Sequence, residues 1–137
     1  MSSVFYRSPK HTYPRVARGE GVYLYDPQRQ ELEVVATGDL RGPVSDAALA
    51  QHWISESAAI IVVAAVPSRT TRKYGERGYR YVHMEAGHAA QNVYLQAASL
   101  GLGTTTVGAF HDERVQTVLA LPEEVQPLCL LPLGYPR

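Results

Sequence analysis

The stretch SLGLGTTTVGAF, Ser99–Phe110, holds three glycines in a threonine-rich run and decides between two kinds of cofactor site. A dinucleotide-binding fingerprint needs a strand, then GxGxxG, then a helix, so that the start of the helix meets the pyrophosphate. Here a helical pattern comes first and a strand pattern follows, and Gly103 and Gly108 are spaced too widely for that fingerprint. No Lys-Ser or Lys-Thr pair follows, as a P-loop would need. The sequence therefore argues against a Rossmann or P-loop nucleotide site.

The three glycines are predicted to have different structural roles. We expect Gly101 to end a helix in the left-handed conformation and Gly103 to form a tight turn. Gly108 interrupts a predicted strand, TTTVGAF at Thr104–Phe110, where glycine costs stability and usually marks a bulge or the close approach of a ligand. The residues alone leave both the plain bulge and the ligand contact open.

The segments around these glycines predict the elements that hold them. Tyr81–Leu100 has a helical pattern with many small side chains, which let a neighbouring helix or sheet approach closely. We therefore expect a central, largely buried helix there. The run HDERVQTVLAL, 111–121, predicts a short helix that Asp112 caps. The closing segment QPLCLLPLGYPR, 126–137, predicts a last strand.

The amino-terminal half predicts a hairpin and a buried strand. Val22–Tyr25 and Leu32–Val35 are β-rich runs joined by DPQRQ, whose Asp-Pro pair favours a turn. Ala58–Val66, AAIIVVAAV, is apolar throughout and stops at Pro67. That pattern is typical of a central strand covered on both faces.

Between the hairpin and this strand, DAALAQHWISES at 46–57 predicts a short helix. Ser45 or Asp46 can cap it, and three of its side chains are expected to face inward: Leu49, Trp53 and Ile54. The resulting order, β-β-α-β-α-β-α-β from a starting hairpin, favours an α+β sandwich over a regular parallel α/β fold. We expect residues 1–137 to form one domain.

Composition and charge limit the classes of partner. Thirteen basic and thirteen acidic residues balance, so the net charge gives no reason to expect nucleic acid or an anionic membrane as a partner. Residues 1–19 are the exception, because they hold four Lys or Arg residues and no acid. They predict a basic, flexible arm or, alternatively, a set of cations for a bound phosphate.

Other single features point to an ordinary cytoplasmic protein. Cys129 is the sole cysteine and lies in the apolar segment PLCLLPLG, which predicts a buried structural thiol. The longest apolar run is too short to span a bilayer, and the first residues lack the apolar core of a secretory signal. His83 and His88 would lie about 140° apart around a helix, so no metal site is expected there.

Four segments together resemble a known family. They are GVYLYDPQRQELEVVATGDLR at 21–41, RKYGERGYRY at 72–81, GYRYVHMEAGHAAQNVYLQAASLGLGTTTVGAF at 78–110, and LLPLGYPR at 130–137. They resemble the nitroreductase-like flavoproteins, and within them the SagB-type dehydrogenases, which oxidise azoline rings to azoles in ribosomally made peptides. The resemblance extends over residues 19–137.

The resemblance implies a fold, an assembly and a cofactor. The implied fold is an α+β, nitroreductase-like α/β sandwich, with a mostly antiparallel sheet packed on a central helix. The implied assembly is a tightly intertwined homodimer with FMN at its interface. The implied activity is an FMN-dependent oxidoreductase that transfers hydride through flavin N5. Nitroaromatics, quinones, enones and modified peptides all fit a flat flavin pocket as substrates.

The resemblance also assigns cofactor-binding residues. Thr106, Val107, Gly108 and Ala109 match the segment that lines the flavin ring beside N5 and O4. The glycine–alanine pair suits that place, because no bulky side chain keeps a backbone N–H away from the ring. Arg137 matches the basic C-terminal residue that binds the FMN phosphate, which a guanidinium fork fits well.

Lys73 and Tyr74 match a Lys-Tyr pair to which the azoline-oxidising branch assigns proton transfer. Oxidation of an azoline ring needs a base for a carbon proton while a hydride leaves to N5. Neighbouring residues point apart in regular elements, so a shared role needs irregular backbone, which Gly75 permits. An exposed lysine beside a packed tyrosine remains the alternative.

Two segments typical of the family have no match here. They are an opening Arg-x-Ser-x-Arg helix and a SAGALYP segment before the hairpin, so the sequence is expected to be N-terminally truncated relative to the family. Two other interpretations therefore stay open beside the FMN enzyme. One is a flavin-free, degenerate member that acts as a scaffold or partner-binding subunit, and the other is a fragment of a longer enzyme.

Overall fold

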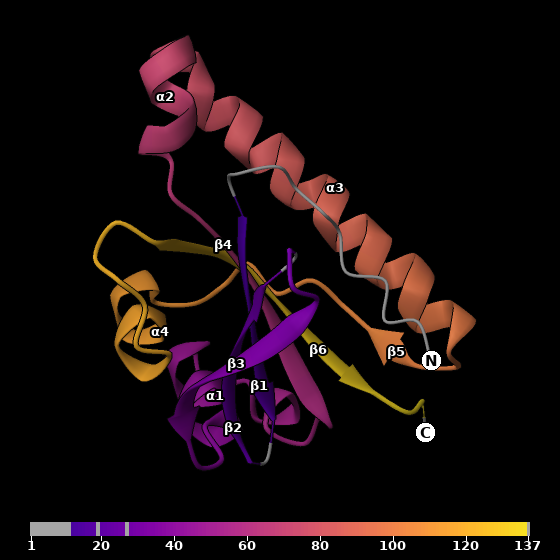
Figure 1. The fold of residues 1–137 in the computed structure, drawn as a ribbon. Helices are drawn as coiled ribbons and strands as arrows, with labels where there is room; N and C mark the ends of the chain where they lie inside the picture. The colour runs from indigo at the N-terminus through magenta and orange to yellow at the C-terminus, as the bar shows by residue number, and fades with distance from the viewer. Residues whose placement is uncertain (1–11, 19, 27, 137) are drawn as a thin grey trace.

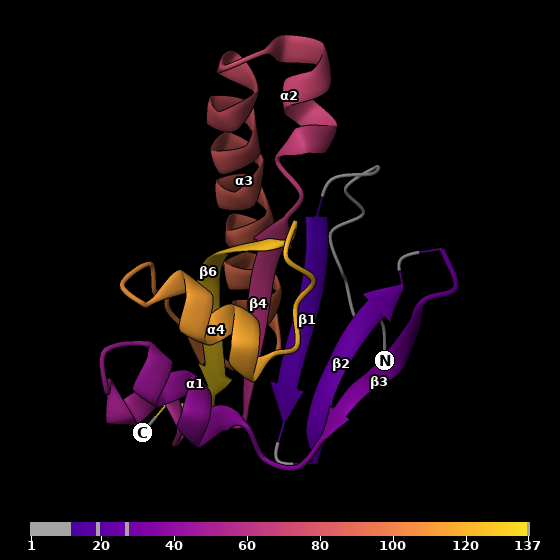
Figure 2. The ribbon, with the colours of Figure 1, turned by 90° about the vertical axis from the view of Figure 1, so that its left-hand side faces the viewer.

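The computed structural model describes residues 12–18, 20–26 and 28–136, which form an antiparallel sheet with helices on both faces (Figures 1 and 2). In this part of the chain the sheet has six strands in the order β3-β2-β1-β4-β6-β5. The strands are β1 (Thr12–Arg18), β2 (Gly21–Asp26), β3 (Glu31–Thr37), β4 (Ala59–Ala65), β5 (Gly103–Thr104) and β6 (Gln126–Gly134). The helices are α1 (Arg41–Ala47), the 3-10 turn η1 (His52–Ile54), α2 (Ser68–Tyr74), α3 (Arg77–Ser99) and α4 (Asp112–Val118). The predicted α+β class is confirmed.

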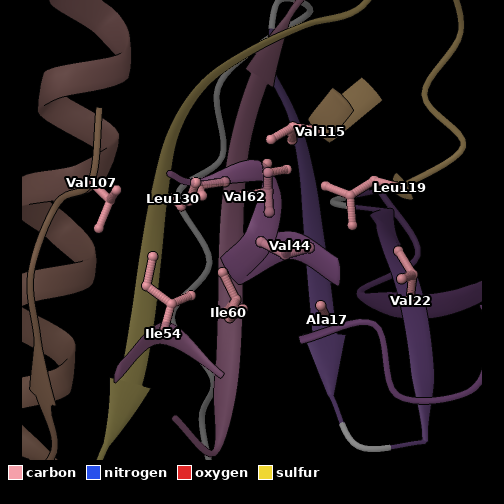
Figure 3. Packing of buried hydrophobic residues seen from close by; sticks show 12 residues of the cluster. Ala17, Val22, Val44, Ile54, Ile60, Val62, Val107, Val115, Leu119 and Leu130 are labelled. Atoms are coloured by element: carbon pink, nitrogen blue, oxygen red, sulfur yellow. The ribbon is translucent and has the colours of Figure 1, made fainter. Parts of the chain in front are cut away.

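Strand β4 is the centre of the fold because its two faces support two separate cores. It pairs with β1 on one side and β6 on the other, both antiparallel. Successive strand residues point to opposite faces. Ile60 and Val62 accordingly pack with Leu130 under α1, η1 and α4 (Figure 3), while Val63 packs on the other face. The prediction of a central strand covered on both faces is confirmed.

The second core lies between the sheet and α3. Ala86 and Ala90 meet Val63, Cys129 and Leu131 there, and their small side chains bring the helix close to the sheet. The predicted close approach and the buried thiol are thus confirmed. Gly101 adopts φ +70° just after the helix, as expected of its stop.

Only one side of α3 is buried, so the prediction of a largely buried helix is wrong for this chain alone. Figure 1 shows α2 and the first turns of α3 extending past the end of the sheet. Large side chains are exposed on the remaining surface of α3: Tyr79, Tyr81, Met84 and Leu95. No helix in the described part of the chain combines the length and the apolar character that a membrane crossing requires.

The prediction of a basic arm is wrong for residues 12–18, which form β1 between β2 and β4. This strand contains Pro14, although proline has no N–H to donate to a ladder. The register explains why it is tolerated. Pro14 lies opposite Val63 of β4, whereas the pairing with β2 begins only at Arg15. Proline therefore occupies a position with a neighbouring strand on one side.

The helix predicted at 46–57 lies earlier in the chain, as α1. Asp39 receives the Arg41 N–H at 3.1 Å, and Pro43 stands in the first turn, where proline is tolerated. Leu49 and Ala50 then adopt the left-handed conformation, with φ +58° and +54°, which ends the helical path.

The predicted caps and inward side chains of this segment are largely wrong for the same reason. Ser45 and Asp46 lie inside α1 rather than at its start. Leu49 and Trp53 are exposed, and of the three expected inward side chains only Ile54 is buried.

The strand predicted at Thr104–Phe110 is also largely wrong. Regular pairing ends at Thr104, and beyond it only Val107 forms a bridge, to Leu130. Residues 105–110 are otherwise an irregular connection to α4. That helix is confirmed, but His111 is its N-cap residue and Asp112 is its first helical residue.

Candidate functional site

The connection between β5 and α4, residues 105–111, is fixed to three different elements. The Thr106 N–H donates to the Tyr94 hydroxyl oxygen on α3, at 2.6 Å. Val107 exchanges two backbone hydrogen bonds with Leu130 of β6, at 2.8 and 2.9 Å. The side-chain amide of Gln51, just before η1, donates to the Ala109 carbonyl oxygen at 3.2 Å. We call residues 105–111 the anchored loop.

Two of the four backbone amides predicted to contact the flavin therefore already donate hydrogen bonds within the chain. The Thr106 amide is bound to Tyr94, and the Val107 amide is bound to Leu130. The Val107 side chain is buried in the core under α1 and α4 (Figure 3). Thr106 and Val107 thus position the backbone, and neither offers a free amide.

The amides of Gly108 and Ala109 are the available ones. Among the described residues neither has a hydrogen-bond partner for its N–H, and both residues are exposed. A Cβ added to Gly108 would meet no atom within 4 Å, and its φ lies outside the left-handed region. Neither packing within this chain nor backbone conformation therefore requires glycine at position 108. The plain β-bulge is excluded as well, because Gly108 does not lie in a strand.

Tyr94 is a functional candidate that the sequence analysis missed. The hydrogen bond from Thr106 lowers the pKa of the Tyr94 hydroxyl, since an accepted hydrogen bond stabilises the phenolate. The ring of Tyr94 packs beside Cys129 and Leu131. Burial raises the pKa of the Cys129 thiol to about 11, so this cysteine stays protonated near neutral pH and does not act as a nucleophile.

Gln51 is a second candidate that sequence reasoning missed. Its side-chain amide donates to the Ala48 carbonyl at 2.8 Å as well as to Ala109. The backbone carbonyl oxygen of Gln51 accepts a hydrogen bond from the hydroxyl of Ser45, a buried residue, at 2.9 Å. The turn after α1 thereby holds Gln51 in place, and Gln51 holds the loop. Such contacts join segments far apart in the sequence, so no local pattern reveals them.

Lys73 and Tyr74 end α2, and both are exposed. The ammonium of Lys73 lies 5.0 Å from the centroid of the Tyr74 ring. That ring in turn contacts Tyr81 edge-to-face, with the centroids 5.1 Å apart. Gly75, with φ +57°, follows as the end of the helix. The two side chains therefore lie together, although they are neighbours in a regular helix.

The structure does not bring this pair to the anchored loop within one chain. Tyr74 contacts Tyr81, and the loop contacts Tyr94. The segment of α3 between Tyr81 and Tyr94 spans about 20 Å at the helical rise per residue. Arg137, the predicted phosphate contact, lies outside the described residues.

A shallow hollow lies at the tip formed by α2 and α3. It has a volume of about 480 Å³ and is lined by Glu76, Arg77 and Arg80. Gly78 lets the two helices touch there, because a Cβ at this position would come within 2.8 Å of the Thr71 Cα.

Comparison with known proteins identifies the family. The model of the nitroreductase family matches residues 9–135, so the chain belongs to the nitroreductase family. It is 48% identical to MJ1384 of Methanocaldococcus jannaschii, named as a nitroreductase, over 115 residues. That match covers 84% of this chain and 57% of MJ1384, so the chain spans a little over half the length of this relative.

Two solved structures are similar in fold. A crystal structure from Anabaena variabilis, titled as a nitroreductase, superposes with a TM-score of 0.87 at 32% identity, over 93% of this chain and 27% of that one. A chain of the Escherichia coli microcin synthetase McbBCD complex, with truncated pro-MccB17 bound, gives a TM-score of 0.82 at 25% identity. That superposition covers 92% of this chain and 52% of the other. The nitroreductase-like fold is thus confirmed.

Proposed function

We propose that this chain forms the flavin wall of an FMN-dependent oxidoreductase. The observation that carries the proposal is the pair of exposed amides at Gly108 and Ala109, neither of which has a partner among the described residues. The open space at the Gly108 Cα leaves room for a flat ring to approach the backbone. Bound FMN supplies hydride exchange at its N5 atom. The two amides would donate hydrogen bonds to the ring edge, and Tyr94 and Gln51 would keep them in position.

The specific activity that we propose is that of the SagB-type branch, the oxidation of azoline rings to azoles. Its support is the Lys-Tyr pair at 73 and 74 and the likeness to the microcin synthetase complex. When an azoline becomes an azole, a hydride leaves one ring carbon for the flavin and a proton leaves the other. The Lys73 amine, in its neutral form, or the Tyr74 phenolate would take that proton. The flavin is reduced, and the ring is oxidised by two electrons.

We propose a homodimer because one chain leaves the two parts of the site about 20 Å apart. The exposed face of α3 supports this, since Met84 and Leu95 lie 54% and 61% exposed on one helical stripe. A second copy covering that stripe would bring its own Lys73 toward the anchored loop. In keeping with this function, a cytoplasmic location remains our prediction.

The dimer predicts the effect of a charge on this stripe. Replacing Leu95 by aspartate is expected to convert dimer to monomer at micromolar concentration, because a buried unpaired carboxylate opposes association. Sedimentation velocity measures the change. Leu49→Asp is the control, since Leu49 is equally exposed on a different surface. A wild-type monomer, or a Leu95→Asp dimer, would contradict the assembly.

Titration with FMN tests the function. The protein is expected to shift and sharpen the flavin absorbance near 450 nm and to quench its fluorescence, with a saturable, one-to-one stoichiometry per chain. If no binding occurs up to millimolar FMN, the flavin proposal is wrong. The alternative of a flavin-free scaffold or partner-binding subunit would then remain.

A further inference from the structure

We propose that the tip of α2 and α3 binds the anionic group of a planar substrate, a carboxylate or a phosphate. The inference deepens the proposed function, on which it rests for the identity of the reaction, by naming the chemical class of its substrate. The segment RTTRKYGERGYR, 69–80, holds five cations and one acid, although the charges of the whole chain balance. The fold gathers them where Arg72 and Lys73 end one helix and Arg77 begins the next.

Four of these cations, Arg72, Lys73, Arg77 and Arg80, form no ion pair with another described residue. Ion pairs are seen at Arg29–Asp26 and Arg41–Asp39, but none involves Arg72, Lys73, Arg77 or Arg80. The first turn of α3 contains no acidic residue, so its two arginines oppose the helix dipole. Glu76 lines the same hollow and forms no ion pair among the described residues. Because the segment 69–80 carries five cations and one acid, its local field is positive, and a bound anion would lower it.

The tip is hollowed beside Arg77 and Arg80. The hollow is shallow and open to solvent, with a volume of about 480 Å³, so a ligand can reach both guanidinium groups. On α3, Arg77 is a neighbour of both Arg80 and Tyr81, because residues three and four apart lie next to each other. Tyr81 contacts Tyr74 edge-to-face, so the two rings lie at the same tip as the arginines. Arginine forks and aromatic edges together match a planar group that carries an anion.

The position also fits the proposed chemistry. Lys73 and Tyr74 belong to the same tip, so an anion held by Arg77 and Arg80 would place the rest of the ligand beside the proposed base. The arginines would then act in binding and orientation. A neutral ligand of the same shape would lack the ionic contact with these arginines and would bind more weakly.

The experiment measures equilibrium binding by calorimetry at low salt, with three probes of similar shape: 4-nitrobenzoate, 4-nitrophenyl phosphate and 4-nitrobenzamide. We expect at least one anion to bind about tenfold tighter than the neutral amide. The stronger of the two anions identifies carboxylate or phosphate as the preferred group. The preference should fall in Arg77→Gln and Arg80→Gln and persist in Arg29→Gln, an exposed arginine at the β2–β3 turn.

Equal affinities for anions and amide would overturn the inference, as would a preference that survives both substitutions. A change in sedimentation without a change in binding would also overturn it, because the arginines would then serve a contact between copies of the chain. The binding measurement needs no turnover. A protein that binds the anions but takes up no FMN would therefore support this site while contradicting the proposed flavin function.

Discussion

Replacing Gly108 by valine is expected to weaken FMN binding at least 100-fold and to leave the fold intact. An added Cβ at this position meets no atom of the chain within 4 Å, so the substitution costs the folded protein little. The branched side chain would stand where the flavin ring has to approach the amides, and a displacement of about 1 Å at such a site costs on the order of 100-fold. Fluorescence titration with FMN measures the affinity.

Matched variants separate a blocked ring from general damage. Gly42→Val tests a glycine that also has free space around its Cα but lies in α1, and it should bind FMN as the wild type does. Gly108→Ala should have an intermediate affinity, because its methyl group is smaller. The assignment of the flavin contact to Gly108 would be wrong if Gly108→Val bound FMN normally, or if Gly42→Val lost FMN binding to the same extent.

Replacing Lys73 by methionine is expected to lower the rate of azoline oxidation by about 10²- to 10⁴-fold, the usual contribution of a positioned acid or base. Methionine keeps the length of the side chain and removes its proton-transfer group. FMN affinity should stay unchanged, because the proposed contacts to the flavin ring come from the Gly108 and Ala109 amides and not from Lys73. The test follows flavin reduction in single turnover with a thiazoline-containing peptide.

The control for Lys73 is Arg114→Met, which removes an exposed cation from α4. It should keep the wild-type rate. A Lys73→Met variant that reduces its flavin at the normal rate would contradict the base assignment. A variant that instead loses FMN would place Lys73 in cofactor binding.

The fold could be predicted where local pattern and tertiary environment agree. Ala58–Val66 is apolar at every position because both faces of β4 are covered, and Asp26 accepts the Gln28 amide at the turn between the hairpin strands β2 and β3. Gly101 ends α3 as expected. β1 was missed because residues 1–19 were interpreted from their charge as an arm, and only the register shows that Pro14 lies beyond the pairing with β2.

The candidate site was predicted in position but not in detail. The sequence located Gly108 and Ala109, yet it expected a strand, since TTTVGAF has β-forming residues and the contacts that bend the chain come from elsewhere. Tyr94 and Gln51 supply those contacts across long sequence separations. No local pattern distinguishes a tyrosine that accepts a loop amide from one that packs in a core. For the same reason the sequence could not tell which of four neighbouring amides are free.

Amide hydrogen exchange, read by NMR with and without FMN, tests the assignment of the flavin wall most directly. Without FMN, we expect the Gly108 and Ala109 amides to exchange rapidly and the Val107 amide, which is bonded to Leu130, to be protected. Saturation with FMN should slow exchange at positions 108 and 109 and leave Val107 as it was. If FMN binds while both amides continue to exchange rapidly, the anchored loop is not the flavin wall.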